Sequence, residues 1–335
     1  MSCDCDYALD KGSVTEQHYS TCSSVLAGRR RKRNLDGTLR LGNQHLEGLE
    51  VDFLYHLGLN TSTYDLPAMF GDVKFVCLGG TKHRMKELAC YMTKLLGYNE
   101  DQAPVNLTKH SLRFAMYKVG PVLSVSHGIG IPSMTTALQE VIKLMYYAKA
   151  VDPFFFRVGT SGGIDIPAGS VVVSSFGMNG TFEKSYNLPI LGTIHKFPSQ
   201  LDTRLCQELA SLASDAGEFQ TFIGGTMGAE DFYRGQGRLD GPFCNYTEAD
   251  KMAFLRKLSS LGIRNIEMEA NAFGAITKEA GVRAAIVCVT LLNRLDGDQV
   301  TSTKDILKTW EKRSMFIVGN FVTAYMKKHG MTCKA

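Results

Sequence analysis

Short apolar runs alternate with amphipathic stretches from about residue 50 onward, and this alternation limits the fold more than any other feature of the 335-residue chain. Runs of this length that end in glycines are typical of buried strands. Strands that alternate with helices predict a central, mostly parallel or mixed sheet with helices on both faces. We expect strands at residues 74–80, 121–130, 154–164, 170–176 and 284–292, and a shorter one at 264–269.

The same pattern predicts the helices. Apolar residues recur at helical spacing over residues 85–96, and Gly97 provides the stop. A second helix follows the next strand, with Pro132 near its first position. A third ends near Gly281, and a fourth forms the C-terminal end of the chain. No internal repeat is present, so we expect one folded domain.

The first 40 residues lack this periodicity and are rich in Ser, Thr, Gly and charged residues. We therefore expect a largely disordered extension over residues 1–40, followed by a single domain over residues 41–335. The formal net charge of +4 is concentrated in RRRKR at 29–33, which leaves the rest of the chain one charge negative. A near-neutral folded part is not a general polyanion binder, so nucleic-acid binding is not expected. The alternative is RNA contact or nuclear localisation through the basic run.

The cysteines and the apolar residues indicate a cytoplasmic protein. The nine cysteines are odd in number and form no CxxC pair, and Cys77 and Cys288 lie inside apolar runs, as buried free thiols do in a reducing compartment. No apolar run approaches the roughly 20 residues that span a bilayer. The acidic N-terminus lacks an apolar signal segment, and we expect no membrane association.

Ligands of such sheets bind at the carboxyl ends of strands, and two nucleotide-binding motifs are excluded there. GGTKHR at 79–84 lacks the spacing of a GxxxxGK[ST] loop, which excludes nucleoside triphosphate hydrolysis by that route. GIGIPS at 128–133 has Ser133 where a dinucleotide fingerprint needs its third glycine, so no dinucleotide cofactor is expected.

Two glycine turns that carry arginines predict a phosphate site. Gly80 with Arg84, and Arg157 with Thr160 and nearby glycines, combine backbone N–H groups with a guanidinium, which suits a tetrahedral oxyanion. Arg157 follows three phenylalanines in a strand expected to be buried, and a buried arginine needs an anionic partner. The alternative is that the glycines only permit tight turns and the arginines form surface ion pairs.

The polar segment DFYRGQGRLDG at 231–241 is longer than a simple turn requires. In an extended chain, Gln236 and Arg238 would point the same way. An amide with a donor and an acceptor, next to a guanidinium, matches an imide N–H between two carbonyl oxygens, as in uracil. Phe232 would stack on such a ring. A solvated polar loop is the alternative.

Two glutamates in RNIEMEANAF form the third candidate group. If the strand alternates regularly, Glu267 and Glu269 share one face and Met268 lies on the other. Such a pair would hold sugar hydroxyls or act as acid and base in glycoside hydrolysis. The alternative is that one of them pairs with Arg264.

Six separated segments, taken together, resemble the uridine phosphorylases of animals, members of the nucleoside phosphorylase-I family. The similarity covers roughly residues 50–325. The resemblance implies an α/β three-layer sandwich around a twisted mixed sheet, and the reaction of uridine with phosphate to uracil and ribose-1-phosphate. Selectivity among uridine, deoxyuridine and thymidine stays open. The segments are FGDVKFVCLGG, YKVGPVLSVSHGIGIPS, RVGTSGGI, DFYRGQGRLDG, RNIEME and VCVTLLNRLDGDQ.

The resemblance also implies a role for each matching residue. A homodimer with shared active sites is implied, because His56 and Arg113 match residues that a neighbouring subunit donates. The substrates are uridine and inorganic phosphate, and neither a cofactor nor a metal is implied. The main part in catalysis falls to Arg157, Gln236, Arg238 and Glu269. The residues that match phosphate-binding positions are Gly80, Arg84, Arg113, Arg157 and Thr160. Those that match base-binding positions are Phe232, Gln236, Arg238 and Arg294, and Arg294 lies in a mobile segment that closes over the base. Those that match ribose-binding positions are His56, Thr160, Met268 and Glu269.

The chain departs from the family pattern at two positions. A glutamate that helps bacterial relatives to hold potassium is replaced by Phe114, so no potassium site of that kind is expected. Gly228 stands where the animal pattern has a cysteine, and we expect it to loosen the loop that presents Phe232. Two alternatives remain: a nucleosidase that uses water, which the paired glutamates permit, and a catalytically silent nucleoside-binding paralogue, which the altered loop suggests.

Overall fold

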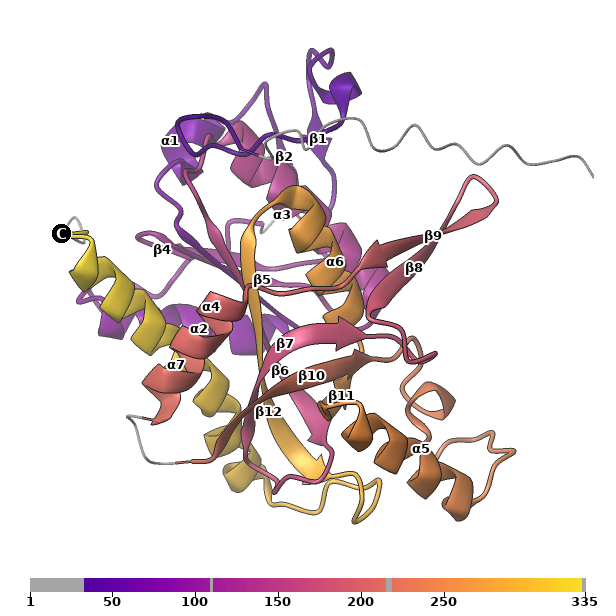
Figure 1. The fold of residues 1–335 in the computed structure, drawn as a ribbon. Coiled ribbons are helices and arrows are strands. Elements are labelled where there is room, and N and C mark those ends of the chain that lie inside the picture. The colour runs from indigo at the N-terminus through magenta and orange to yellow at the C-terminus, as the bar shows by residue number, and fades with distance from the viewer. Residues whose placement is uncertain (1–32, 109–110, 215–218, 333–335) are drawn as a thin grey trace, which may run out of the picture. The chain divides into compact units, whose positions relative to one another are not determined.

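The apolar runs form the middle strands of one eight-stranded sheet in the computed structural model, which describes residues 33–108, 111–214 and 219–332 (Figure 1). The central strands are buried along most of their length because helices cover both faces. In order across the sheet the strands are β11 (Ile263–Glu267), β10 (Thr221–Gly228), β7 (Val171–Met178), β12 (Arg283–Asn293), β6 (Phe154–Gly163), β3 (Phe75–Gly79), β5 (Val122–Ser126) and β4 (Met116–Val119).

The sheet is mixed and partly closed. Strands β12, β6, β3 and β5 run parallel, whereas β7 pairs antiparallel with β12, and β4 antiparallel with β5. Strand β11 also pairs with β6, where Asn265 faces Gly163 and Ile266 faces Gly162. This extra pairing joins β6, β12, β7, β10 and β11 into a ring and brings the end of β11 next to the end of β6. The mixed α/β architecture expected from the sequence is confirmed.

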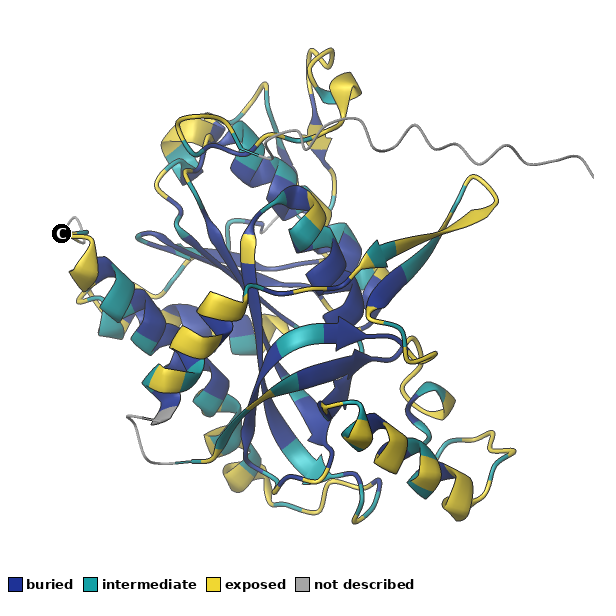
Figure 2. Ribbon diagram, viewed as in Figure 1, coloured by how far each residue is buried: buried dark blue, intermediate teal, exposed yellow. Residues whose placement is uncertain are grey.

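Helices cover the two faces of the sheet (Figures 1 and 2). On one face α2 and α4 contact α7, and α7 packs on β6 and β12; on the other face α3 contacts α6 and α1, and α6 packs on β7, β10 and β12. The sides of the helices that face the sheet are buried, and their outer sides are exposed. Their bounds are α1 (Leu66–Phe70), α2 (Lys82–Leu95), α3 (Ile131–Tyr147), α4 (Thr203–Ser214), α6 (Ala270–Ala280) and α7 (Lys304–Lys328), and α5 (Glu248–Ser260) packs beside β11.

Several helix ends lie where the sequence predicts them. Gly97 follows the last turn of α2 with a φ of 74°, and Gly281 follows α6 with a φ of 71°, both in the left-handed region that favours glycine. Pro132 lies in the first turn of α3. These local signals depend on backbone geometry, which is why they hold without knowledge of the fold.

Two glycine-containing segments differ from the prediction. The run at 154–164 does not turn at its glycines, because β6 continues to Gly163 and pairs with both β12 and β11. Gly228 does not loosen a loop, because it is the last residue of β10 and pairs with Glu267. A Cβ atom at Gly228 would lie 2.3 Å from Oδ1 of Asn271, so this strand end fits a glycine closely against the start of α6.

The remaining short elements have weak sequence signals, and we did not predict them. The hairpin of β8 (Ser185–Ile190) and β9 (Thr193–Pro198) projects from the body of the protein, and its tip is exposed (Figure 2). A smaller pair, β1 (Phe53–Leu54) and β2 (Leu59–Asn60), follows the 3₁₀ turn η2 (Gln44–Leu46). Across the described ranges, no helix has the length and apolar character needed to cross a bilayer.

The described chain begins before the domain start expected at residue 41. Thr38 forms a bridge with Val151, and Leu39 is buried in the main core, so residues 33–39 already pack on residues of the sheet domain. Contacts between residues divide the chain into two units, with the boundary between residues 31 and 32. The expectations for residues 1–32, including most of the basic run, lie outside the described residues.

Candidate active site

A cavity of about 440 Å³ lies where the ends of β3, β5, β6, β11 and β12 come together. Ten of the residues that the sequence singled out line it, although they come from segments almost 215 positions apart in the chain. Only His56 and Arg113 of the predicted set are not among the lining residues. The ten are Gly80, Arg84, Arg157, Thr160, Phe232, Gln236, Arg238, Met268, Glu269 and Arg294.

One end of the cavity is formed by the turn between β3 and α2. Thr81 caps α2, because its hydroxyl accepts a hydrogen bond from the backbone N–H of Arg84 at 3.2 Å. The same hydroxyl accepts from Nε of Arg84 at 3.3 Å, which holds this guanidinium at the cavity wall. Burial lowers the pKa of Arg84, and the charge of Glu311 opposes the shift. A helix N-terminus and a guanidinium together favour an anion at this end.

Arg157 lies at the centre of the cavity and is buried. Its Nη2 atom forms an ion pair with Glu267 at 2.5 Å and a second one with Glu269, and its Nη1 atom donates to Sγ of Cys288 at 3.3 Å. The anionic partner expected for a buried arginine is therefore the glutamate pair. The alternative that one of these glutamates pairs with Arg264 is wrong, because both carboxylates contact Arg157 instead.

The two glutamates are held by backbone N–H groups as well. Glu267 accepts from the N–H groups of Glu269 at 2.9 Å and Ala270 at 2.6 Å, at the first turn of α6. Glu269 accepts from the N–H of Gly130 at 2.6 Å. Burial raises the pKa of Glu267 to about 8, despite the opposing charge of Arg157. Burial would also raise the pKa of Glu269, but Arg157 outweighs it and lowers that pKa to about 2.

The amide of Gln236 also lines the cavity. The expectation of an extended chain from Gln236 to Arg238 is wrong, because Gln236 ends the 3₁₀ turn η3 (Arg234–Gln236) and Gly237 is left-handed with a φ of 64°. Both side chains nevertheless line the cavity. Arg294 donates through Nη1 to Oε1 of Gln236 at 3.4 Å and through Nη2 to its carbonyl oxygen at 3.0 Å, so the amide is oriented by a neighbouring guanidinium.

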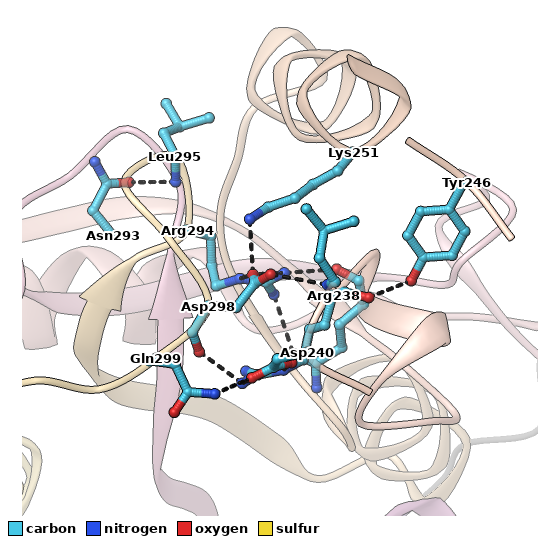
Figure 3. Close-up of polar contacts among 11 residues, drawn as sticks. Arg238, Asp240, Tyr246, Lys251, Asn293, Arg294, Leu295, Asp298 and Gln299 are labelled. Atoms are coloured by element: carbon cyan, nitrogen blue, oxygen red, sulfur yellow. Dashed lines mark hydrogen bonds and ion pairs between the residues drawn. The ribbon is translucent and has the colours of Figure 1, made fainter. Parts of the chain in front are cut away.

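Arg238 is fixed by two aspartates (Figure 3). It donates through Nε and Nη2 to the carboxylate of Asp240 at 2.8 and 2.6 Å, and through Nη2 to the carbonyl oxygen of Asp298 at 2.6 Å. Its guanidinium carbon lies 4.5 Å from the centre of the Phe232 ring, which is within the range of a cation–π contact. Arg238 and Phe232 therefore reach the cavity as one unit.

Asp298 is a site residue that the sequence did not reveal. Its carboxylate contacts Arg294 at 2.9 Å, accepts from Lys251 at 3.0 Å and accepts from the N–H of Leu239 at 2.9 Å (Figure 3). Burial would raise the pKa of Asp298, but these three partners outweigh it and lower the pKa. The only sequence signal is an acidic residue after Gly297, which does not indicate the arginines that it contacts.

The side chain of Arg294, expected in a mobile segment that closes over the base, lies inside the protein in this structure. It is fully buried, and it packs directly on β6. A Cβ atom at Gly162 would lie 2.8 Å from Cγ of Arg294, so the glycine in this strand makes room for the arginine. Gly162, which we expected in a turn, therefore lies in β6 and lets the side chain of Arg294 approach this strand closely.

His56 and Arg113 lie next to each other, away from the cavity lining. The hydroxyl of Ser111 donates to the carbonyl oxygen of His56 at 2.5 Å and accepts from the N–H of Arg113 at 3.3 Å. Nδ1 of His56 lies 2.6 Å from the carboxylate of Glu140, which also accepts from the backbone N–H of His56. Phe114 is buried beside the His56 ring, with 6.2 Å between the ring centres.

The protein thus combines a mixed sheet flanked by helices with an arginine-lined cavity at the ends of its strands. The chain belongs to the phosphorylase superfamily, whose family model matches residues 74–323. This match confirms the family expected from the six segments.

Uridine phosphorylases are among the proteins to which the chain is similar. The chain is 45% identical to uridine phosphorylase 1 of Mus musculus over 288 residues, which are 86% of this chain and 93% of the mouse protein. It is 47% identical to the uridine and thymidine phosphorylase of Caenorhabditis elegans over 279 residues, which are 83% of this chain and 91% of that protein. The crystal structure of uridine phosphorylase from Schistosoma mansoni in complex with thymidine matches with a TM-score of 0.82 at 38% identity, over 88% of this chain and 99% of that chain.

The raised pKa of Glu267 predicts a pH dependence of stability. A carboxyl with a folded-state pKa of about 8, above its ordinary 4.5, contributes stability at low pH that is lost as the pH rises toward 8. Glu267→Gln keeps an oxygen acceptor for the backbone N–H groups but cannot ionise. We expect the melting temperature of this variant, relative to that of the wild type, to rise between about pH 5 and 8.

Glu269 does not interfere with this measurement. Its lowered pKa of about 2 means that its contribution is lost only as the pH falls below the ordinary 4.5. A difference between variant and wild type that stays constant across the pH range would contradict the raised pKa of Glu267.

Proposed function

We propose that this protein catalyses the reversible phosphorolysis of uridine to uracil and ribose-1-phosphate. One observation carries the proposal: Arg84, Arg157, Gln236 and Arg238 line the same cavity, so cations suited to phosphate and groups suited to a pyrimidine share one site. The mouse and nematode relatives are named as phosphorylases of uridine, which supports the proposal, and an inactive uridine phosphorylase of Schistosoma mansoni, 38% identical over 86% of this chain, is the reason to test the silent paralogue as well. Deoxyuridine and thymidine are further candidate substrates, because the relatives include a uridine and thymidine phosphorylase.

Phosphate would bind at the end of the cavity formed by Gly80 and Arg84, with Arg157 and Thr160 at its other side. An oxygen of phosphate attacks the anomeric carbon of the ribose while the bond from that carbon to N1 of uracil breaks. Arginines that hold the nucleophile in line convert a bimolecular encounter into an oriented one. No covalent intermediate with the protein is needed.

Uracil would leave toward Gln236 and Arg238. The electron pair of the broken bond passes to the uracil ring and its carbonyl oxygens, and the uracil anion then takes up a proton. Donors that are already oriented toward this charge stabilise it without reorganisation. Arg294 and Asp298 supply that orientation, because they hold Gln236 and Arg238 in place. Phe232 would stack on the ring.

The ribose would lie between these two ends, beside Met268 and Glu269. The carboxylate of Glu269 accepts from Gly130 and pairs with Arg157, and its lowered pKa keeps it an acceptor for sugar hydroxyls. Binding of the sugar here sets the anomeric carbon between the phosphate and the base.

We also propose a homodimer in which His56 and Arg113 of one subunit complete the site of the other. Three exposed apolar side chains next to them in sequence support this: Phe53 is 48% exposed, Tyr55 78% and Leu112 91%. Exposed apolar groups of this size are typical of contact surfaces between chains. A second copy of the chain would cover these apolar side chains, and His56 and Arg113 would then lie at the cavity of that copy.

A single assay tests the reaction. We expect uracil release from uridine only when phosphate is present, with ribose-1-phosphate formed in equal amount, because phosphate is the nucleophile. Uracil release is followed spectrophotometrically. Equal release without phosphate would show a nucleosidase, and tight uridine binding without turnover would show a silent paralogue.

Arg238→Leu tests the base end. Loss of one oriented donor to the leaving group should lower kcat/KM for uridine by roughly 10²–10³-fold, with phosphate binding retained. The matched control is Arg234→Leu, because Arg234 is exposed in the same segment and does not line the cavity. Near-normal turnover by Arg238→Leu, or an equal loss in the control, would show that the base site is misassigned.

A mixed dimer tests the shared site. Arg113→Ala and Arg84→Ala should each be weakly active alone, because each removes one phosphate arginine. If Arg113 acts across the interface, a heterodimer of the two variants contains one intact site and about half of the wild-type activity. The heterodimer is isolated with two different affinity tags. A heterodimer as weak as its parents would place Arg113 in the site of its own subunit, and an Arg113→Ala homodimer with wild-type activity would place it outside both sites.

A further inference from the structure

The imidazole of His127 lines the cavity, but none of the described residues forms a hydrogen bond with it. His127 follows β5 directly and is 1% exposed, and both Nδ1 and Nε2 lack a partner. Buried polar atoms in folded proteins nearly always have partners, because an unpaired one keeps the full cost of leaving water. An unpaired imidazole on a ligand cavity therefore points to a contact that the ligand completes.

The backbone places His127 at the phosphate end of the cavity. The N–H of His127 donates to the carbonyl oxygen of Gly79 at 2.8 Å, and the N–H of Gly128 donates to that of Gly80 at 3.0 Å. The turn after β5 therefore lies alongside the turn after β3. Because Gly80 and Arg84 form the proposed phosphate end, the His127 ring enters the cavity next to them.

The surroundings keep this ring neutral. Burial, followed by the charge of Arg157, lowers the pKa of His127 to about 3; Arg84 acts in the same direction, and Glu269 opposes it. A neutral imidazole has one nitrogen that donates and one that accepts. Guanidinium and backbone N–H groups only donate, so His127 adds a neutral acceptor to a site otherwise rich in donors.

We propose that His127 contacts bound phosphate and accepts the hydrogen of its P–OH group. Inorganic phosphate near neutral pH carries at least one such hydrogen, and the arginines can take only its unprotonated oxygens. This hydrogen bond leaves the unprotonated oxygens of phosphate free to bind the arginines and to attack the ribose. Sulfate, of the same shape, carries no hydrogen at this pH, so the acceptor favours phosphate over sulfate. The inference rests on the proposed function, because it adds a residue to the same phosphate site.

Two variants test the contact. His127→Leu removes the acceptor and His127→Gln keeps one, and both are neutral, so the charge of the site stays the same. Dissociation constants of phosphate and of sulfate are measured by titration calorimetry with the full-length wild type and both variants. We expect His127→Leu to weaken phosphate binding by roughly 10–100-fold and sulfate binding by less than about threefold. His127→Gln should recover most of the preference for phosphate.

The contrary outcomes are distinct. An equal loss of phosphate and sulfate affinity, or unchanged phosphate affinity, would overturn the proposal. A rise in the KM of uridine but not of 2′-deoxyuridine, with phosphate binding unchanged, would assign His127 to the ribose and overturn it as well.

Thermal unfolding of the ligand-free variants separates the proposed contact from a structural role. His127→Leu removes no hydrogen bond seen in this structure, so its melting temperature should equal or exceed that of the wild type. A purely structural ring would lower it and leave the preference for phosphate intact. Because calorimetry needs no turnover, a wild type that binds phosphate but releases no uracil would contradict the proposed function and not the role of His127.

Discussion

The charge of one buried guanidinium, Arg157, holds the site and part of the fold together. Arg157 belongs to β6, Glu267 ends β11 and Glu269 precedes α6, so its two ion pairs join β6 to a connection between β11 and α6 that lies about 100 residues further along the chain. An unpaired charge in this position would cost several kcal/mol, whereas the carboxylate of Glu269, the carboxyl group of Glu267 and the thiol of Cys288 surround it here. We propose the same arginine as a phosphate ligand, so one side chain both stabilises the site and binds the substrate.

The ring of strands makes these ion pairs possible. Strand β11 reaches β6 only where Gly162 and Gly163 pair with Ile266 and Asn265, and one residue further along Glu267 meets Arg157. On the other side of Gly162 lies Arg294, which orients Gln236 and, with Asp298, belongs to the network that holds Arg238. The two ends of the cavity are thus connected through one glycine-containing strand. This connection explains why these glycines form no turn.

Local signals predicted much of the fold. The apolar runs became β3, β5, β7 and β12, because burial of apolar side chains is set by the side chains themselves. The stops at Gly97 and Gly281 followed from backbone geometry. The hairpin β8–β9 was missed, because β9 is mostly exposed and lacks an alternation of apolar residues, and β8 contains Pro189, which is atypical of a strand. Asp298 was missed as a site residue and His127 was given no role, because the importance of each depends on contacts with residues from other segments of the chain.

The sequence by itself determined the residue types of the site, the positions of most of the main strands along the chain and the family to which the chain belongs. It did so because motif residues and apolar periodicity are local properties. Only the tertiary structure decided which glutamates pair with Arg157, that Gln236 and Arg238 reach one cavity from a 3₁₀ turn rather than a strand, and that Arg294 is buried. Those outcomes depend on the closure of the sheet through β11 and β6, a pairing between segments about 100 residues apart that no local pattern encodes.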